Sequence, residues 1–216
     1  GYSRPIRKGS TLSQHQTRRS VENPATIPKP TLPEQKSYDD QLSRDAQHRA
    51  WRRSGVSERH EAERSPDDDS PWAVKARHIR DQLGTGAIFA LVGPRGTGKT
   101  QMAVETMRYE VRNYHPSVLI VRAMDVFIDI REAYDSPEVT ERDQIKRFIA
   151  PRLLVIDEAS ERSDSEWENR MFTYVIDQRY AAMTDTILIS NQTPKDFEQS
   201  IGSSIYSRIT EAGGIV

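Results

Sequence analysis

Residues 93–100 read Gly-Pro-Arg-Gly-Thr-Gly-Lys-Thr, and this stretch decides the fold. The pattern G-x-x-x-x-G-K-[ST] binds phosphate when it lies between a strand and a helix. Here an apolar run, Ala87 to Val92, precedes it, and a helical stretch, Thr100 to Asn113, follows it. Glycines let successive backbone N–H groups point at an anion, and the helix N-terminus adds a partial positive charge. The residues that we expect to bind a nucleotide are Gly93, Pro94, Arg95, Gly96, Thr97, Gly98, Lys99, Thr100 and Gln101.

Two of these side chains have expected chemical roles, and two acidic residues later in the chain complement them. Lys99 is expected to reach the β- and γ-phosphates, and the hydroxyl of Thr100 is expected to bind Mg²⁺. The apolar run at 153–156 ends in Asp157 and Glu158, and the carboxyl ends of parallel strands meet at the edge where open sheets bind ligands. We expect Asp157 to hold Mg²⁺ and Glu158 to act as the general base that polarises the attacking water.

Three further polar residues are weaker candidates for the same chemistry. Asn191 follows another apolar run, where it could contact the γ-phosphate, orient the water or only turn the chain. Arg208 lies in an amphipathic stretch and is a surface residue in a lone subunit. In a ring or spiral it could instead reach a neighbour's γ-phosphate, a role worth ~10³–10⁵ in rate. Arg179 could assist in the same way or form a structural ion pair.

Short apolar runs alternate with helical stretches from residue 71 to the end. The runs are nearly continuous in apolar residues, as strands buried on both faces should be. Strands that alternate with helices predict an α/β fold, with a parallel sheet covered by helices on both faces. The predicted strands are Ala87–Val92, Val118–Val121, Leu153–Ile156 and Thr186–Ile189. The predicted helices are Pro71–Leu83, Thr100–Asn113, Met124–Tyr134 (alternatively continuing to Phe148 after Pro137) and Glu166–Tyr180.

The first 70 residues differ in composition from the rest. Residues 1–36 carry seven Lys or Arg, two Glu and five of the twelve prolines. We therefore expect a disordered or extended arm, which is either a solvated tail or a segment that orders on a partner. From Ser37 to Gly55 the apolar residues recur at helical spacing, with acidic residues first and arginines last, which favours a helix. This helix could either dock on the main domain or carry a partner interface. Glu58 to Ser70 is charged and is expected to be a linker.

The composition excludes several classes of function. The 216 residues include no cysteine, which excludes disulfides, thiolate zinc sites and cysteine nucleophiles. The formal net charge is −1, so contact with a nucleic acid or a membrane would need a local patch. The longest apolar run, Ala87 to Val92, is far shorter than the ~20 residues of a membrane-spanning helix, and no apolar signal segment begins the chain. We expect a soluble, cytoplasmic protein.

Together these motifs resemble those of the AAA+ ATPases, from about Trp51 to Val216. The resemblance rests on the phosphate loop, Leu-Leu-Val-Ile-Asp-Glu at 153–158, Ile-Ser-Asn at 189–191 and Ser-Arg at 207–208. Within this class the sequence is most similar to the DnaC-like replicative helicase loaders of bacteria and phages, with the IstB-like transposition ATPases as relatives. Arg-Ser-Gly-Val at 53–56, followed by His60, resembles the segment that leads into their ATPase domain, and Ile-Asp-Gln-Arg at 176–179 fits the same pattern.

The resemblance implies a function and partners. It implies a three-layer P-loop domain at 71–216 with strand order 5-1-4-3-2. Such a domain binds ATP with Mg²⁺, hydrolyses it slowly, assembles into rings or spirals and contacts single-stranded DNA. Aromatic rings stack on bases without sequence preference, so the candidate DNA contacts are Tyr134, Ser165 and Trp167, with ordinary helix packing as the alternative. The resemblance also implies that the segment at 37–70 binds the hexameric replicative helicase, for which the candidate contacts are Tyr38, Leu42 and Trp51.

One departure from the family pattern leaves three functions open. In the family a fifth strand follows the residue that matches Arg208 and leads to a last helix whose arginine senses the γ-phosphate. Here the sequence stops at 213–216, so we expect a fifth strand that is truncated or barely begun. The open functions are a helicase loader, a transposition ATPase that prepares target DNA, and an adaptor that binds nucleotide without hydrolysing it. The low-complexity N-terminus argues against the second.

Overall fold

A computed structural model describes residues 32–64, 68–113, 117–133, 138–163 and 165–216, the side chains of residues 32–39 and 42 excepted. The chain divides into two compact units, Gly1–Tyr38 and Asp39–Val216. The second unit holds the sheet and the candidate site. The arm expected at residues 1–36 lies outside the described residues as far as residue 31.

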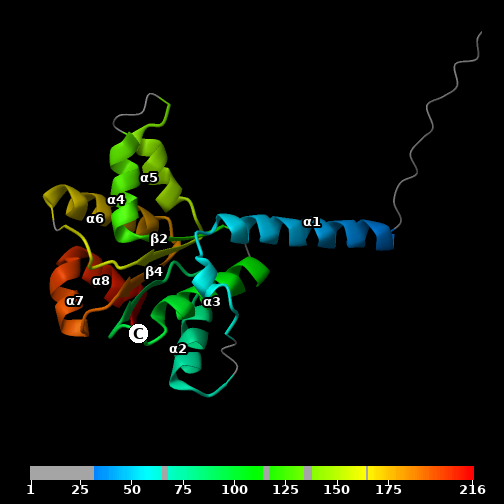
Figure 1. Cartoon of the computed structure of the whole chain (residues 1–216), viewed down its shortest axis with the longest axis horizontal. Helices are drawn as coiled ribbons and strands as arrows, with labels where there is room; N and C mark the ends of the chain where they lie inside the picture. The colour runs from blue at the N-terminus through cyan, green and yellow to red at the C-terminus, as the bar shows by residue number, and fades with distance from the viewer. Residues whose placement is uncertain (1–31, 65–67, 114–116, 134–137, 164) are drawn as a thin grey trace, which may run out of the picture. The chain divides into compact units, whose positions relative to one another are not determined.

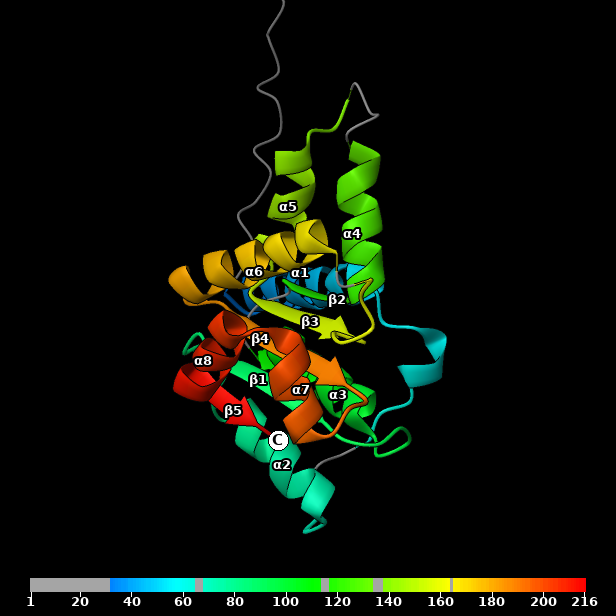
Figure 2. The same ribbon diagram turned by 90° about the vertical axis from the view of Figure 1, so that its left-hand side faces the viewer.

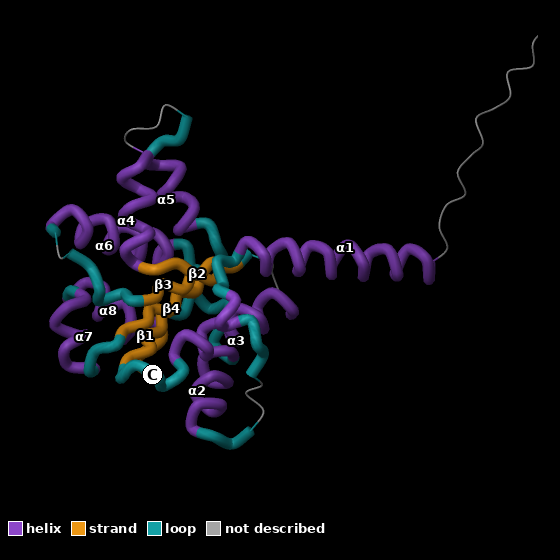
Figure 3. Tube along the Cα trace, in the orientation of Figure 1, coloured by secondary structure: helices purple, strands orange, loops and turns teal. Residues whose placement is uncertain are grey.

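Five parallel strands form one sheet at the centre of the second unit (Figures 1 and 3). The strand order is β2-β3-β4-β1-β5, which confirms the order expected from the AAA+ resemblance, read from the opposite edge. The strands are β1 (Ile88–Val92), β2 (Val118–Arg122), β3 (Leu153–Asp157), β4 (Asp185–Ser190) and β5 (Gly213–Ile215). The first four match the predicted strands to within one residue at each end, and β5 is the short edge strand that we expected.

Helices cover both faces of the sheet and make it the middle of three layers (Figure 2). Helices α2 and α3 pack on one face, and α4 to α8 share a core on the other. The helices are α1 (Leu32–Arg53), α2 (Pro71–Arg80), α3 (Lys99–Asn113), α4 (Ala123–Glu132), α5 (Glu141–Ile149), α6 (Glu166–Ala181), α7 (Pro194–Ile201) and α8 (Ser203–Ala212), with a 3-10 turn, η1 (Glu58–His60), after α1. Within the described parts of the chain, no helix combines the length and the apolar character that a membrane crossing requires.

The two cores explain why the strands are continuously apolar. In β1, Ile88 and Ala90 belong to the core under α4 to α8, whereas Phe89 and Leu91 belong to the core under α2 and α3. The side chains of β3 and β4 alternate between the same two cores. Each fully buried large apolar side chain contributes about 1.5–3 kcal/mol, so burial on both faces holds these strands in register.

Three helices depart from the predictions. Helix α1 begins at Leu32 rather than at Ser37 and takes in the last residues expected to belong to the arm; Pro33 falls in the first turn, where its missing N–H costs nothing. The stretch expected from Met124 onward is two helices, because Thr140 starts α5 by accepting from the backbone N–H of Asp143 at 3.2 Å. Helix α7 was not predicted, although Thr-Pro at 193–194 is a good helix start.

The turn after α1 covers the edge of β2. The backbone N–H of Ile120 donates to the carbonyl of Ser54 at 2.7 Å. Gly55 has φ +81°, and a Cβ there would stand 2.4 Å from the carbonyl oxygen of Ile120. The buried hydroxyl of Ser54 donates to the carbonyl of Trp51 at 2.7 Å. A glycine is required for so close an approach at positive φ, and the turn fixes the end of α1 against the sheet.

Arg179 is a buried structural cation. Its side chain is 0% exposed, and burial lowers the pKa of its guanidinium to about 10, which leaves it charged at neutral pH. It donates to Thr186 Oγ1 and to the carbonyls of Phe148, Ile149, Pro151 and Asp185. These bonds join α6 to the end of α5 and to β4. Of the two roles left open by the sequence, the structure supports the structural one.

Replacing Arg179 by Met keeps most of the side-chain volume but removes every donor. We expect the free energy of unfolding, measured by urea denaturation, to fall by about 3 kcal/mol or more, because several buried carbonyls lose their partner. The matched control is Arg170→Met on the same helix, where only an exposed ion pair with Glu166 is lost, at a cost of about 0.5 kcal/mol. Equal losses in the two variants would contradict the structural role.

Candidate nucleotide-binding site

The loop between β1 and α3 has the geometry of a phosphate cradle. Gly96 and Gly98 have φ +81° and +83°, a region that favours glycine. The pairing of β1 with β4 extends into the loop, since the backbone N–H of Gly93 donates to the carbonyl of Ser190 at 3.3 Å. Helix α3 begins at Lys99, so its first N–H groups, which have no partner within the helix, are available to an anion in the loop.

The ammonium of Lys99 lies over the loop. Its Nζ donates to the carbonyls of Gly93 and Pro94, each at 2.8 Å. Burial lowers the pKa of Lys99 below its ordinary value, and the carboxylate of Asp157 opposes this shift. A partly desolvated ammonium whose acceptors among the described residues are two neutral carbonyls can turn to a phosphate oxygen, which is a stronger partner.

The two expected metal ligands are brought together. Thr100 Oγ1 donates to Asp157 Oδ2 at 2.9 Å, which joins α3 to β3. The other carboxylate oxygen, Asp157 Oδ1, accepts from the backbone N–H of Glu158 at 2.8 Å. Hard oxygen ligands suit Mg²⁺, which takes one or two protein ligands and completes its shell with phosphate oxygens and water.

Glu158 has the conformation and environment of a functional carboxylate. Its φ is +54°, a sparsely populated value for a residue other than glycine, and such strain clusters at functional sites. Burial raises the pKa of Glu158 above its ordinary 4.5. The carboxylates of Glu161 and Asp157 raise this pKa further, against the guanidinium groups of Arg122 and Arg95. A carboxylate with a raised pKa is a better proton acceptor.

These groups line one cavity of about 450 Å³. Its lining residues are Arg59, His60, Arg95, Gly96, Gly98, Lys99, Thr100, Gln101, Asp157, Glu158 and Asn191. The remaining loop residues, Gly93, Pro94 and Thr97, line an adjoining cavity of about 310 Å³ together with Trp72. The structure therefore gathers the expected loop, metal and base residues, and Asn191, at one edge of the sheet.

The residues present fit a triphosphate with Mg²⁺. The loop glycines supply backbone donors, Lys99 supplies a cation, and the Thr100–Asp157 pair supplies oxygen ligands at hydrogen-bonding distance from each other. Glu158 follows Asp157 in the chain and lines the same cavity. This arrangement can bind phosphate and activate a water for attack on it.

Residues 57–64, which we call the strap, form one wall of the site. From the sequence, most of this segment was expected to be a linker. His60 Nδ1 lies 3.1 Å from Gln101 Oε1, and Arg59 and His60 both line the cavity. The strap has no apolar periodicity. Its only signal in the sequence was the similarity of residues 53–56 and His60 to the segment before the ATPase domain of helicase loaders.

The strap runs along α3 through a series of polar contacts. These are Gln101 Nε2 to the Ala62 carbonyl at 3.0 Å, Arg108 Nη2 to the Glu61 carbonyl at 2.9 Å, the Arg64 backbone N–H to Glu105 Oε1 at 2.9 Å, and the Arg112–Glu63 ion pair at 2.7 Å. The side chain of Gln101, which we expected to contact nucleotide, is thus engaged by the strap.

Trp72 anchors the other side of the loop. Its indole N–H donates to the carbonyl of Gly98 at 3.2 Å, and the guanidinium of Arg64 lies 4.3 Å from the centre of its ring. The end of the strap is therefore joined to the phosphate loop through this side chain.

Arg208 is the expected catalytic residue that lies outside the cavity. It is in α8, where its Nη2 lies 3.0 Å from Asp177 Oδ1 of α6, and its Nη1 donates to the carbonyl of Ser204 at 2.8 Å. This placement matches a surface residue of a lone subunit. A role at a neighbour's nucleotide stays a prediction.

Two of the candidate DNA contacts have structural partners. Trp167 makes an edge contact with Phe127, and the guanidinium of Arg131 lies 4.7 Å from its ring centre. Ser165 caps α6 by accepting from the backbone N–H of Glu168 at 3.2 Å. These contacts favour the helix-packing alternative, and Tyr134 lies outside the described residues.

Of the candidate partner contacts, Trp51 packs on its own domain. Its ring is half-buried against the core under α2 and α3, with the guanidinium of Arg108 at 4.3 Å. The backbones of Tyr38 and Leu42 lie in α1, and their side chains fall outside the described part of the chain.

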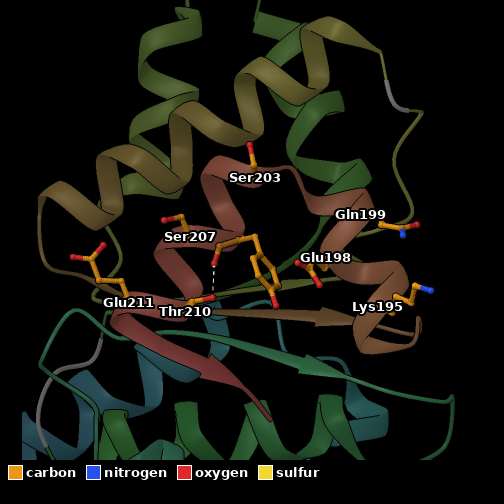
Figure 4. Close-up of a pocket in the computed structure, with 8 residues that line it drawn as sticks. Lys195, Glu198, Gln199, Ser203, Ser207, Thr210 and Glu211 are labelled. Atoms are coloured by element: carbon orange, nitrogen blue, oxygen red, sulfur yellow. Dashed lines mark hydrogen bonds between the residues drawn. The ribbon is translucent and has the colours of Figure 1, made fainter.

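A second groove, of about 880 Å³, lies over α7 and α8 (Figure 4). Its lining residues are of polar types, of which Lys195, Glu198 and Glu211 are charged. It shares no lining residue with the phosphate cavity and contains none of the residues expected to bind or hydrolyse a nucleotide.

Comparison with known proteins agrees with this site. The family described as IstB-like ATP binding protein matches residues 80–210. The protein YdaV of Escherichia coli strain K12 is 27% identical over 141 residues, which are 65% of this chain and 56% of that protein. The replicative helicase loader DnaC of the same strain is 24% identical over 136 residues, 62% of this chain and 55% of that protein. The chain thus spans little more than half the length of these relatives.

Solved structures share the fold. The crystal structure of the DnaC helicase loader superposes with a TM-score of 0.62 at 19% identity, covering 74% of this chain and 98% of that one. AMPPCP-bound DnaA from Aquifex aeolicus superposes with a TM-score of 0.59 at 20% identity, covering 70% and 49%. At these identities the likeness shows a common fold.

Substituting Ala for Gly98 tests the loop geometry. The added Cβ would stand 3.1 Å from Trp72 Nε1 at φ +83°, so we expect the loop to shift and the affinity for a fluorescent ATP analogue to fall roughly tenfold or more. The control is Gly202→Ala, which has φ +89° but no atom within 4 Å of the Cβ. Both glycines have positive φ, so both variants should lose some stability from the backbone, whereas an equal affinity in both would count against the cradle.

Proposed function

The chain belongs to the family of IstB-like ATP-binding proteins, and we propose that it is a Mg²⁺-dependent ATPase of the AAA+ class. The observation that carries this proposal is the Thr100–Asp157 hydrogen bond at 2.9 Å, in a cavity that Lys99 and Glu158 also line. If the loop were an ordinary glycine-rich turn, nothing would explain why a cation that can bind phosphate, two metal ligands and a general base lie together beside it.

Each residue has a distinct task in the proposed reaction. The backbone N–H groups of the loop and the ammonium of Lys99 bind the phosphates and offset their charge. Thr100 and Asp157 would hold Mg²⁺, which would supply positive charge to offset that of the phosphates. Glu158 accepts the proton of the attacking water, and Asn191 orients that water or the γ-phosphate from the end of β4.

The proposed biological role is that of a replicative helicase loader in the cytoplasm. Its support is the similarity to DnaC at 24% identity and the fold shared with the DnaC helicase loader. On this proposal α1 contacts the hexameric helicase through Tyr38 and Leu42, several copies assemble on single-stranded DNA, and the phosphate site controls grip and release. The strap supports such control because it joins the end of α1 to the phosphate loop.

Arg208 would take part in the proposed reaction only after several copies of the chain assemble. To act on a neighbour's nucleotide it would have to exchange Asp177, now at 3.0 Å, for the γ-phosphate. A phosphate carries more charge than a carboxylate and accepts a bidentate guanidinium, so assembly on a filled site could drive the exchange. A chain without assembly would then hydrolyse slowly.

A second candidate function is a transposition ATPase that prepares target DNA. The match of the IstB-like family over residues 80–210 favours it. It uses the same phosphate chemistry, so it differs from the first candidate only in its partner.

Replacing Glu158 by Gln should separate binding from hydrolysis. We expect ATP to bind with unchanged affinity while turnover falls at least about a hundredfold, because the amide cannot accept the proton. In the wild type, turnover should decline on the acid side at a pH higher than an ordinary glutamate would give, because the raised pKa means that Glu158 takes up its proton sooner as the pH falls. Titration with a fluorescent ATP analogue measures the affinity, and phosphate release measured across pH gives the turnover and its pH dependence.

The control for that experiment is Lys99→Ala, which should weaken ATP binding itself. Wild type that binds ATP but releases no phosphate under any tested assembly condition would favour the non-hydrolysing adaptor. Turnover that survives Glu158→Gln would remove Glu158 from its proposed role.

Joint substitution of Tyr38 and Leu42 by Ala should weaken binding to a replicative helicase about tenfold or more, because aromatic and apolar anchors carry most interface energy. Pull-down and titration with purified helicase measure the effect. The control is Gln41→Ala, an exposed position on the same helix. Wild-type binding by the double variant would exclude this face of α1, and a wild-type chain that binds a transposase but no helicase would favour the second candidate.

A further inference from the structure

The phosphate cavity contains a cationic side chain that no motif predicts. Arg59, in η1, is exposed and lines the cavity together with Lys99, Asp157 and Glu158. Its guanidinium has no hydrogen bond, ion pair or ring contact within the described part of the chain. The other arginines nearby are engaged: Arg64 lies over Trp72, Arg95 pairs with Glu161, Arg108 with Glu105, and Arg112 with Glu63.

The backbone around Arg59 is held in place even though its side chain is free. The backbone N–H of His60 donates to the carbonyl of Ser57 at 2.9 Å, and that of Glu61 donates to the carbonyl of Glu58 at 3.2 Å, which closes the turn. On one side the turn is fixed to β2 through Ser54, and on the other it is fixed to α3 through His60 and Gln101. The free guanidinium is therefore presented to the cavity from a fixed support.

Arg59 adds to the cavity a positive charge that is paired with no carboxylate of the described residues. Arg59, Arg95 and Lys99 are the cationic lining residues, and Asp157 and Glu158 are the carboxylates. Arg95 already pairs with Glu161 at 2.9 Å, so without Arg59 only Lys99 would face the two lining carboxylates. Arg59 therefore makes the lining more favourable to an anion. The planar guanidinium also matches two phosphate oxygens at once, which an ammonium cannot do.

We propose that Arg59 binds the polyphosphate of the nucleotide as a second cation contributed by the same chain, from the strap. This inference rests on the proposed nucleotide-binding function and adds a specificity residue to it. The strap positions Arg59, so the segment before the phosphate loop takes a direct part in holding the ligand.

The test compares the full chain as wild type, Arg59→Gln and Arg52→Gln by isothermal titration calorimetry. Arg52 is an exposed arginine at the end of α1 that lines neither cavity of the loop, so it loses the same charge elsewhere. The titrants are Mg²⁺-ATP and Mg²⁺ with inorganic triphosphate. We expect Arg59→Gln to bind both about tenfold or more weakly, as for loss of a charge-assisted hydrogen bond. Arg52→Gln should bind both as wild type does.

Three outcomes would overturn the proposal. Arg59→Gln could bind ATP as tightly as wild type. It could lose affinity for ATP but keep affinity for inorganic triphosphate, which would assign Arg59 to the base or ribose. Its melting temperature could fall together with its affinity, which would make the loss structural; we expect no change in melting temperature, because Arg59 is exposed and has no described contact.

Failure of this inference can be distinguished from failure of the proposed function. Wild type that binds neither titrant would refute the nucleotide site as a whole, together with the role of Arg59. Wild type that binds both, with Lys99→Ala weakened and Arg59→Gln unchanged, would leave the site in place and refute only the part given to Arg59.

Discussion

The site depends on the register of three parallel strands, β1, β3 and β4, whose carboxyl ends lie side by side at one edge of the sheet. Burial on both faces holds the pairing of Val92 with Ser190 and of Ile156 with Leu188, so the phosphate loop, Asp157 and Asn191 emerge at one rim. The site would not tolerate a shift in this register. A shift of β3 by one residue would move Asp157 by about 3.3 Å along the strand, which is more than the 2.9 Å that separates its carboxylate from Thr100. The polar chemistry thus depends on apolar packing that lies away from it.

The strap is a second segment of the chain, N-terminal to the phosphate loop, that contributes residues to the site. It begins just after Gly55, which meets the edge of β2, follows the polar side of α3 and ends at Arg64, which lies over Trp72. Its individual contacts are exposed or partly exposed, and each exposed ion pair is worth little alone. Together, however, these contacts form a continuous series, and a continuous series of packed and hydrogen-bonded residues can couple two sites. On the proposed function the two sites are the phosphate loop and the helix that contacts a partner.

The features that could be predicted from the sequence are those with a regular apolar pattern or a fixed motif spacing. The strands were found because burial on both faces leaves a continuous apolar run, and the loop was found because its glycines, Lys99 and Thr100 have fixed spacing. The break between α4 and α5 was left open because both halves have helical periodicity and only the cap at Thr140 marks the second start. The strap was missed because its partners are polar groups far along the chain, as with Arg64 and Glu105. Arg179 could not be assigned from sequence, since a buried structural arginine and a catalytic one look alike until its acceptors are known.

The state of two arginines implies an order of events under the proposed function. Arg59 is unpaired among the residues that the structure describes and lines the phosphate cavity, so it can bind a polyphosphate without breaking a described contact. Arg208 is paired with Asp177 and held by Ser204, so it must give up both before it can serve a neighbouring chain. A contact that breaks no existing pair forms at a lower ligand concentration than an otherwise equal contact that must replace one. Nucleotide binding should therefore precede assembly, and the phosphate charge that Arg59 and Lys99 leave unbalanced is what would draw Arg208 of a neighbouring copy away from its carboxylate.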